Sequence, residues 1–479
     1  MKFRSTRGSD QLITFEETLL SAYGKDGGMW MAERVPEISL ETLKDWKHLS
    51  YIEVVQKVVA LHVSEDEIPY KEQEELLNRA YQKFNIKEVV KMAALTKQVQ
   101  VMELFHGESM AFKDLAMCCV SEFLQYFLEK RKSFFTAFIA TSGDTGGSAA
   151  YSVCGKPNID VVVLYPQTFV SEIQAMMMTS IPDDNVHVYA VEGDMMDIDE
   201  LMIEILYDKE FVANNNLGTM NSITFCRLMV QMAHHIWAYL QAAKVIGDYV
   251  DIVVPTGGAG NITACFLAQL SGVPIRAHAV TNINDCFHQI VTNNSVKLAK
   301  VKKTLAPAMD ISFPGNFERV IWLASNQSGE IVSAAINTFL NGEEMHLPEF
   351  VHNKIQKYMQ TAIIDQEGIK SAMLKCYSEH KYFVCPHTAT ALSYIFTRNL
   401  DKDYKNVVAM ATAHPAKFPE ILESVGLPPV PSTIVDGIRK QEKRCLKLEK
   451  DSNWRDLICK KIVDITAKHQ ANNKSLLCN

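Results

Sequence analysis

The sequence predicts an α/β protein with a mostly parallel sheet and a helical N-terminal lobe. Short apolar runs typical of buried strands recur after residue 99, and stretches with helical spacing of apolar residues separate them. Strands joined by helical crossovers usually form a parallel sheet. The chain of 479 residues exceeds what one compact core usually holds, so we expect two or more lobes with a cleft between them.

The first part of the chain, residues 1–95, is expected to be mainly helical. The segments WKHLSYIEVVQKVVALHV and KEQEELLNRAYQKF carry apolar residues at intervals of three and four, as one face of a helix requires. We interpret this region as an accessory lobe.

Residues 96–430 are expected to form the α/β core, in two lobes that the chain crosses more than once. The expected strands are VQVMELF, FFTAFIAT, DVVVLYP, VHVYAVEG, VDIVVPT, IRAHAVT and VVAMATA. Residues 341–380 have a charged, helical pattern and are expected to be an excursion between strands. The final segment, 431–479, gathers lysine and arginine and is expected to be a basic tail, helical or disordered, with a partner-binding surface as the alternative.

Composition and charge argue against several classes of function. With 47% hydrophobic residues, 22% charged residues and a net charge of -8, the chain is typical of a soluble protein without a broad nucleic-acid surface. No apolar run reaches the roughly 18 residues of a membrane span. The polar N-terminus lacks the apolar core of a secretory signal, so we expect a cytoplasmic protein. Arg4 and Arg7 leave a short organelle-targeting sequence open, although Asp10 and Glu16 are unusual in one.

The cysteines do not indicate a metal site. None of the 11 cysteines forms a Cys-x-x-Cys pair, and no histidine cluster has zinc-like spacing. We therefore expect reduced, mostly buried thiols and no bound metal.

Lys113 stands in the string FHGESMAFKDLA, where most of its close neighbours are apolar or small. A lysine in such surroundings loses its proton more readily, as Schiff-base formation and proton abstraction require. The alternative is a lysine whose stem covers apolar surface while its amine reaches water.

Two loops between a predicted strand and a predicted helix can hold anions. Ser142, Gly143, Asp144 and Thr145 follow FFTAFIAT, and their amides and hydroxyls could bind a carboxylate, with a plain helix cap as the alternative. The second loop follows VDIVVP and contains Gly257, Gly258, Ala259, Gly260 and Asn261, which could present amides to a phosphate. A nicotinamide dinucleotide is the competing ligand, but the Gly-x-Gly-x-x-Gly fingerprint is absent.

One lysine and two anion-binding loops together indicate pyridoxal 5'-phosphate as the cofactor. This aldehyde needs a lysine for its Schiff base and a loop for its phosphate, and the amino acid substrate needs a second loop for its carboxylate. Thr412, at the end of VVAMATA, offers a neutral hydroxyl that suits the pyridine nitrogen. For His414 and Lys417 a solvent-facing turn and a direct contact with the site are both open.

Several strings along the chain resemble the threonine synthases, particularly the fungal enzymes and the animal threonine synthase-like proteins. They run in family order to about residue 425 and read TRG, GGMWM, FHGESMAFKDLA, ATSGDTGGSAA, NSITFCR, NFERV, PHTA and ATAHPAKF. The resemblance implies a fold-type II pyridoxal phosphate enzyme, similar to the tryptophan synthase β subunit, with two parallel-sheet lobes and a helical N-terminal lobe. It also implies that Lys113 forms the Schiff base and that Thr412 contacts the pyridine nitrogen.

The resemblance further implies a small phosphorylated amino acid as substrate and a monomer or homodimer without nucleic-acid or membrane partners. Asn221, Ser222 and Arg227 are candidates for a clamp on the substrate phosphate, because arginine matches the geometry of that anion.

The sequence also departs from the family pattern. The phosphate loop of the family usually reads Gly-Asn-Phe-Gly-Asp, whereas this chain has Gly258 and Ala259 there and a neutral Asn261. Cys385 replaces an acid, and Ala391 replaces a frequent glycine. With fewer side chains around the reacting intermediate, we expect a phospho-lyase that forms 2-oxobutyrate, ammonia and phosphate from O-phosphohomoserine or O-phosphothreonine. The alternatives are a true threonine synthase and a catalytically inactive binding or signalling module.

Overall fold

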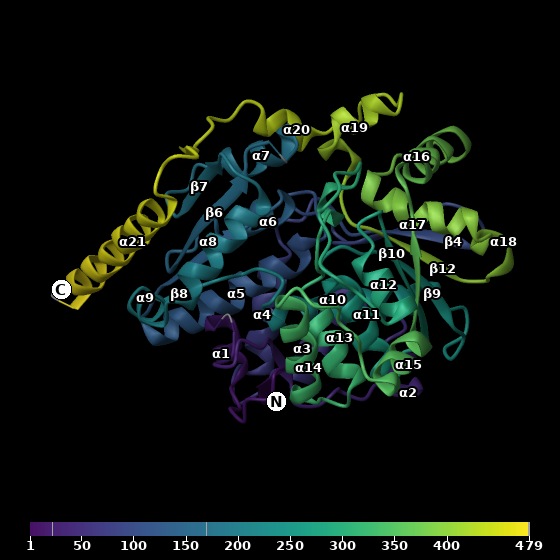
Figure 1. Ribbon diagram of the computed structural model, residues 1–479, viewed down its shortest axis with the longest axis horizontal. Helices are drawn as coiled ribbons and strands as arrows, with labels where there is room; N and C mark the ends of the chain where they lie inside the picture. Colours follow the sequence, from purple (N-terminus) through teal and green to yellow (C-terminus); the bar gives the residue numbers. More distant parts are fainter. Residues whose placement is uncertain (22, 169, 478–479) are drawn as a thin grey trace.

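Two mainly parallel sheets lie side by side in the protein, each flanked by helices (Figure 1). The structure, a computed structural model, describes residues 1–477 apart from residues 22 and 169. In that part of the chain no helix combines the length and apolar character needed to cross a membrane.

The larger sheet has six strands in the order β11-β10-β9-β12-β4-β3. Its strands are β3 (Lys91–Ala94), β4 (Val99–Glu103), β9 (Val250–Pro255), β10 (Ile275–Thr281), β11 (Met359–Ile363) and β12 (Val407–Ala411). All neighbouring strands are parallel except β3 and β4, which are antiparallel. The predicted parallel sheet is therefore confirmed.

The smaller sheet has five parallel strands in the order β13-β7-β6-β5-β8. They are β5 (Phe135–Ala140), β6 (Ile159–Pro166), β7 (Val186–Val191), β8 (Leu217–Gly218) and β13 (Leu446–Leu448). Every residue of β5 and β6 is buried, because helices cover both faces of the sheet. This burial explains why both strands read as mostly apolar runs, with Thr136 in β5 and Asp160 in β6 as polar exceptions.

The N-terminal lobe combines four helices with a small two-stranded antiparallel sheet. These elements are β1 (Phe3–Ser5), α1 (Phe15–Leu20), β2 (Trp30–Ala32), α2 (Leu40–Asp45), α3 (Tyr51–His62) and α4 (Tyr70–Ala80). Ser50 and Glu53 form a capping box that starts α3. The expectation of a mainly helical lobe overlooked this sheet, because three-residue strands leave no periodic pattern.

Helices connect and cover the strands of both sheets. Between β4 and β9 lie α5 (Lys113–Arg131), α6 (Asp144–Val153), α7 (Glu172–Thr179), α8 (Met195–Tyr207), α9 (Lys209–Asn214) and α10 (Phe225–Ala242). Later come α11 (Gly260–Leu270), α12 (Cys286–Asn293), α13 (Phe317–Ala324), α14 (Gly329–Leu340), α15 (Glu349–Tyr358), α16 (Gln366–His380), α17 (Pro386–Thr397), α18 (Leu400–Asp403) and α19 (Pro419–Ser424). Every residue of α10 except Gln241 is buried, and α10 packs against α3, α5 and α11. It is the central helix of the core.

Two regions differ from the sequence prediction. Residues 341–380, expected to be a helical excursion, contain β11, which forms an edge of the larger sheet. The segment 431–479, expected to be a helical or disordered tail, is helical in α20 (Thr433–Ile438) and α21 (Trp454–Leu477), but it also contains the unexpected strand β13. Its last two residues, 478 and 479, lie outside the described residues.

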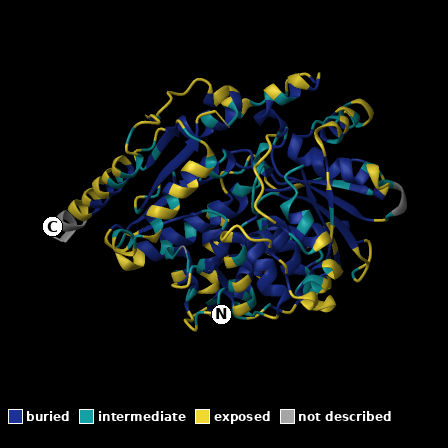
Figure 2. Ribbon diagram, in the orientation of Figure 1, coloured by how far each residue is buried: buried dark blue, intermediate teal, exposed yellow. Residues whose placement is uncertain are grey.

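The C-terminal segment is part of the fold. β13 pairs with β7, and Ile458, Ile462 and Ile465 of α21 belong to the apolar core of the smaller sheet. Figure 2 shows exposed residues along the opposite side of this helix. The sequence prediction overlooked this packing, because the apolar residues through which α21 contacts the sheet are interspersed with many charged residues.

Candidate active site

The predicted loops meet at a cavity of about 190 Å³, near the C-terminal ends of β5, β9 and β12. Twelve predicted residues line it: Lys113, Ser142, Asp144, Thr145, Ser222, Arg227, Gly257, Gly258, Ala259, Gly260, Asn261 and Thr412. The predicted residues Gly143 and Asn221 are not part of the lining. Loops at the carboxyl ends of parallel strands are the usual ligand-binding position in α/β folds.

Lys113 begins α5 at the wall of this cavity. The amide of the preceding Phe112 donates to the Thr412 carbonyl over 2.8 Å, so the start of α5 is tied to the end of β12. Burial lowers the pKa of Lys113, Asp144 opposes this effect, and the nearby cations Arg227 and Lys417 add to it. The amine can therefore lose its proton more easily than a lysine in water.

Asp144 lies between two lysines. Its Oδ2 is 3.5 Å from Lys113 Nζ, and its Oδ1 is 2.7 Å from Lys417 Nζ and 2.9 Å from Gln174 Nε2. Burial alone would raise the pKa of Asp144, but Lys417 and Lys113 hold that pKa well below its usual range. Asp144 is therefore an anion that pairs with the two lysines. It would repel a substrate carboxylate and cannot bind one.

Lys417 is a site residue that sequence reasoning left undecided. Its side chain is 1% exposed, so the solvent-facing alternative is wrong. Besides Asp144, the ammonium donates to the carbonyl of Ser109 over 2.7 Å. Only the string ATAHPAKF pointed to this lysine, because its partners come from distant parts of the chain.

The loop after β5 keeps a small set of donors for an anion. The amides of Gly143 and Gly146 both donate to Thr141 Oγ1 over 3.0 Å. In the first turn of α6 this leaves the amides of Asp144 and Thr145, beside the hydroxyls of Ser142 and Thr145. Asn221 points elsewhere, with its Nδ2 donating to the Ala140 carbonyl over 3.3 Å.

The loop after β9 is closely packed against backbone. A Cβ placed on Gly257 would lie 2.9 Å from the Ala308 carbonyl oxygen and 3.0 Å from Met309 Cα, so a side chain does not fit. Ala259 has a left-handed backbone with φ of 62° and immediately precedes α11. The first turn of α11 thus faces the cavity with its free amides.

Arg227 is a buried cation without a carboxylate partner in the part of the chain that the structure describes. Its Nη1 donates to the Met220 carbonyl over 3.1 Å, and its Nε has no partner among the described atoms. Burial lowers the pKa of this guanidinium to about 10. Since a buried charge is costly unless it is paired, the residue is suited to an anionic ligand.

Two further polar residues of the lining, Gln231 and His387, were not predicted. The Nε2 atom of His387 accepts from the Ala308 amide over 3.0 Å, and burial lowers the pKa of the ring to about 4. His387 belongs to the string PHTA of the family resemblance, and this string was the one sequence signal that could have identified His387 as a site residue. The preceding Cys385 caps α17, with its Sγ accepting from the Thr388 amide over 3.4 Å.

The residues present fit pyridoxal phosphate. Asn261, 6% exposed, lines the cavity, and its Nδ2 has no hydrogen-bond acceptor within the described residues, as a phosphate-binding donor would. Gly257 and the first residues of α11, whose amides are free, line the same cavity as Asn261. Thr412 and Lys113 face the cavity from β12 and α5, where they could hold the ring and the aldehyde end.

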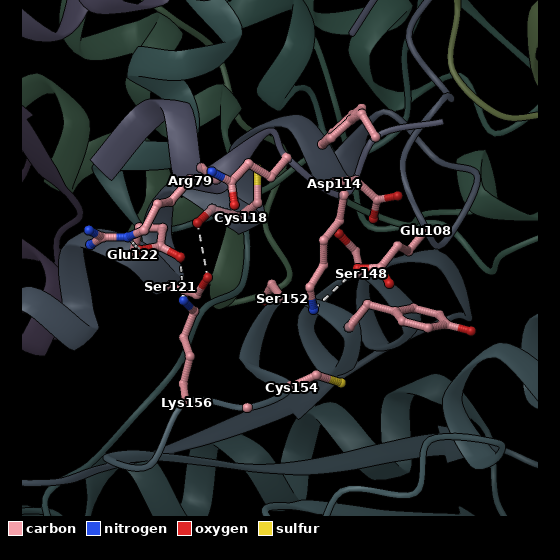
Figure 3. Close-up of a pocket in the computed structure, with 16 residues that line it drawn as sticks. Arg79, Glu108, Asp114, Cys118, Ser121, Glu122, Ser148, Ser152, Cys154 and Lys156 are labelled. Carbon is pink, nitrogen blue, oxygen red and sulfur yellow. Dashed lines mark hydrogen bonds and ion pairs between the residues drawn. The ribbon is translucent and has the colours of Figure 1, made fainter. Parts of the chain in front are cut away.

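A second cavity of about 220 Å³ borders α4, α5 and α6 (Figure 3). Each of its cations already lies beside a carboxylate. Lys156 lies 2.5 Å and Arg79 3.1 Å from Glu122, and Lys83 lies 3.8 Å from Glu108. It therefore has no unpaired cation comparable to Arg227. No group of metal-ligating side chains occurs among the described residues either.

Three family models match most of the chain. Residues 2–81 match "Threonine synthase N terminus", residues 88–339 match "Pyridoxal-phosphate dependent enzyme", and residues 388–458 match "Threonine synthase, C-terminal". Threonine synthase-like 2 of Homo sapiens is 37% identical over 479 residues, which cover 98% of this chain and 99% of the human protein. Threonine synthase of Saccharomyces cerevisiae is 31% identical over 455 residues, 88% of each chain.

Solved structures agree with these sequence matches. Threonine synthase from yeast superposes with a TM-score of 0.89 at 29% identity, over 98% of this chain and 99% of the yeast chain. Pyridoxal phosphate-bound threonine synthase from Brucella melitensis also gives 0.89 at 29% identity, over 96% of this chain and 98% of the other. The similarity extends over both lobes and the helical N-terminal lobe.

Proposed function

Because the chain belongs to the threonine synthase family of pyridoxal phosphate-dependent enzymes, we propose that it is a phospho-lyase acting on phosphorylated amino acids. Its substrates are O-phosphohomoserine and O-phosphothreonine. Each is converted, with one water, to 2-oxobutyrate, ammonia and phosphate.

The observation that carries the choice of substrate is the unpaired guanidinium of Arg227. It is 2% exposed, lines the same cavity as Lys113 and has no carboxylate partner within the described residues. A phosphate supplies the two adjacent oxygens that a guanidinium binds best. The substrate carboxylate would bind at the other side of the cavity, on the amides of Asp144 and Thr145 and the hydroxyls of Ser142 and Thr145.

Lys113 is proposed to be both the attachment point of the cofactor and the base. Bound pyridoxal phosphate supplies an electron sink that stabilises negative charge at the substrate α-carbon. The lowered pKa of Lys113 makes its amine easier to deprotonate, and the neutral amine can take the α-proton. For O-phosphohomoserine the amine must also carry a proton away from the β-carbon, so that phosphate can leave from the γ-carbon. Asp144 stabilises the protonated amine afterwards, since its Oδ2 lies 3.5 Å away.

The proposal of elimination, in place of threonine synthesis, rests on the wall beside Gly258 and Ala259. Synthesis requires water to add to the β-carbon while the substrate remains bound, and the position of that water must be controlled. Here Gly258 and Ala259 offer no polar side chain, and the atom nearest to a Cβ placed on Gly258 is Ile311 Cδ1, at 3.7 Å. With no polar side chain at these two positions to hold the water, release of the unsaturated product and its hydrolysis to 2-oxobutyrate take precedence.

Product analysis tests this function. The purified holoenzyme is incubated separately with O-phosphohomoserine and O-phosphothreonine, and phosphate, 2-oxobutyrate and threonine are quantified in the same samples. Phosphate matched by 2-oxobutyrate supports the phospho-lyase. Phosphate matched by threonine establishes a threonine synthase, and no phosphate from either substrate contradicts both.

A further inference from the structure

His235 of α10 is hydrogen-bonded to Asn261 through one ring nitrogen. The Nε2 atom lies 2.7 Å from Asn261 Oδ1 and 2.9 Å from the Asn261 backbone oxygen. The other ring nitrogen, Nδ1, has no partner among the described residues, and the whole residue is buried. Among the described residues, Asn261, the second residue of α11, is therefore the one hydrogen-bond partner of the His235 side chain.

The surroundings of His235 determine which nitrogen carries the proton. The backbone oxygen of Asn261, 2.9 Å from Nε2, can only accept a hydrogen bond, so this nitrogen must be the donor. A proton on Nδ1 would have no acceptor and would leave the Nε2 lone pair against a carbonyl oxygen. Burial also lowers the pKa of the ring to about 4, so the neutral form persists near pH 7.

The tautomer of His235 in turn determines how the Asn261 amide is oriented. Since the Nε2 proton requires an oxygen, Oδ1 faces the histidine and Nδ2 is turned away from it. Nδ2 has no acceptor within the described chain, although Asn261 lines the cavity. A buried amide donor without an acceptor is rare unless a ligand supplies one.

We propose that His235 is a positioning residue for the cofactor, because it turns the Asn261 amide so that Nδ2 donates to the cofactor phosphate. The inference rests on the cofactor and on the loop proposed to hold it, but it does not depend on whether the reaction is elimination or threonine synthesis. It is therefore tested on cofactor affinity.

The position of His235 on α10 supports this role. Arg227, Gln231 and His235 follow one another at intervals of four and therefore share one face of the helix. Arg227 and Gln231 line the cavity directly, while His235 acts on it through Asn261. The neighbouring His234 is equally buried, but neither of its ring nitrogens has a partner among the described residues. His234 is thus a matched control.

The test compares the dissociation constant of pyridoxal phosphate among full-length variants, by equilibrium dialysis of the apoprotein. His235→Met removes the donor and should weaken cofactor binding by about tenfold or more, as expected for loss of a hydrogen bond to a charged group. His235→Gln places an amide nitrogen near the Nε2 position and should bind within about threefold of the wild type. His234→Met should bind like the wild type. Wild-type affinity in a folded His235→Met variant overturns the inference.

A double-mutant cycle separates positioning from general packing. Asn261→Ala removes the group through which His235 is proposed to act. His235→Met should therefore add no further loss of cofactor affinity in the Asn261→Ala background. A full additional loss would mean that His235 acts independently of Asn261, and it would overturn the inference.

The ring proton gives a measurement on the unmutated holoenzyme, which remains decisive even where a variant does not fold. ¹⁵N NMR of labelled histidine should show His235 neutral, with its proton on Nε2. A proton on Nδ1 would allow the Asn261 amide to turn round, and the inference would be wrong.

Discussion

Lys417 and Asp144 form a buried ion pair, with 2.7 Å between Nζ and Oδ1 and side chains that are 1% and 5% exposed. The same carboxylate lies 3.5 Å from Lys113 through its other oxygen. Asp144 therefore joins the proposed base to a lysine that follows the last strand of the larger sheet. Loss of either partner leaves a charge buried in the site.

Lys417→Met should destabilise the protein and impair catalysis together. Removing one partner of a buried pair typically costs about 3 to 5 kcal/mol, because the other charge stays uncompensated. Urea unfolding measures the first effect and initial rates the second. The double variant Lys417→Met/Asp144→Asn should recover part of the stability but little of the activity, because Asp144 also faces Lys113. Full activity in either variant would contradict the role given to this pair.

Arg227→Met should raise the KM for a phosphorylated substrate by about 10- to 100-fold, since a hydrogen-bonded charge contributes about 1.5 to 3 kcal/mol. Arg227→Lys should restore part of this loss as a point charge. Steady-state kinetics measures the change. Affinity for pyridoxal phosphate and for an unphosphorylated amino acid serves as the control and should stay the same. Equal weakening of all three ligands would indicate damage to the fold.

The fold and the site were predictable to different extents, for physical reasons. Buried strands such as β6 are apolar except for single residues such as Asp160, so the sequence identified them. The short β8 and β13 have two and three residues and no pattern to detect. β11 was overlooked because only Met359 and Ala362 of its five residues are buried, which is not an alternating pattern, and because it lies in a charged segment.

In the site, each strand-to-helix loop has a local signature, and the cavity includes parts of both predicted loops. The interactions of Lys417 and His235 depend on which distant segments meet. No local pattern contains that information. Arg227 was identified only through the string NSITFCR of the family resemblance and the fit of arginine to a phosphate.

Gly143→Ala should weaken substrate binding by about tenfold or more, because the position requires a φ of 122° and a Cβ would lie 2.7 Å from Gln174 Cδ. The displaced Gln174 would lose its bond to Asp144. Gly147→Ala in the following helix α6 is the control, since its Cβ would meet atoms at ordinary distances of 3.5 and 3.6 Å. KM measurements on both variants check this. Similar KM values for Gly143→Ala and Gly147→Ala would contradict a role of the Gly143 turn in substrate binding.

Stability should fall in mild acid because of buried neutral histidines. Burial lowers the pKa of His62 to about 4, whereas the unfolded chain has the ordinary value of 6.5. Between these values the unfolded state binds the extra proton, so the free energy of unfolding decreases as pH falls, by about 1.4 kcal/mol per unit for one such group. The contribution is complete above pH 6.5 and lost below about 4.

His62→Gln should therefore reduce the slope of unfolding free energy against pH by about one such increment, as measured by urea unfolding between pH 7 and 5. Because the comparison uses slopes, an overall loss of stability in the variant does not affect it. An unchanged slope would show that His62 is not neutral in the folded protein.

The most direct test of the proposed reaction is the molar ratio of 2-oxobutyrate to phosphate released from O-phosphohomoserine, with threonine quantified in the same reaction and Lys113→Ala as the blank. The account predicts a ratio near one, no accumulation of threonine and no phosphate release by Lys113→Ala. Threonine formed in equal amount to phosphate would contradict the phospho-lyase and make the protein a threonine synthase.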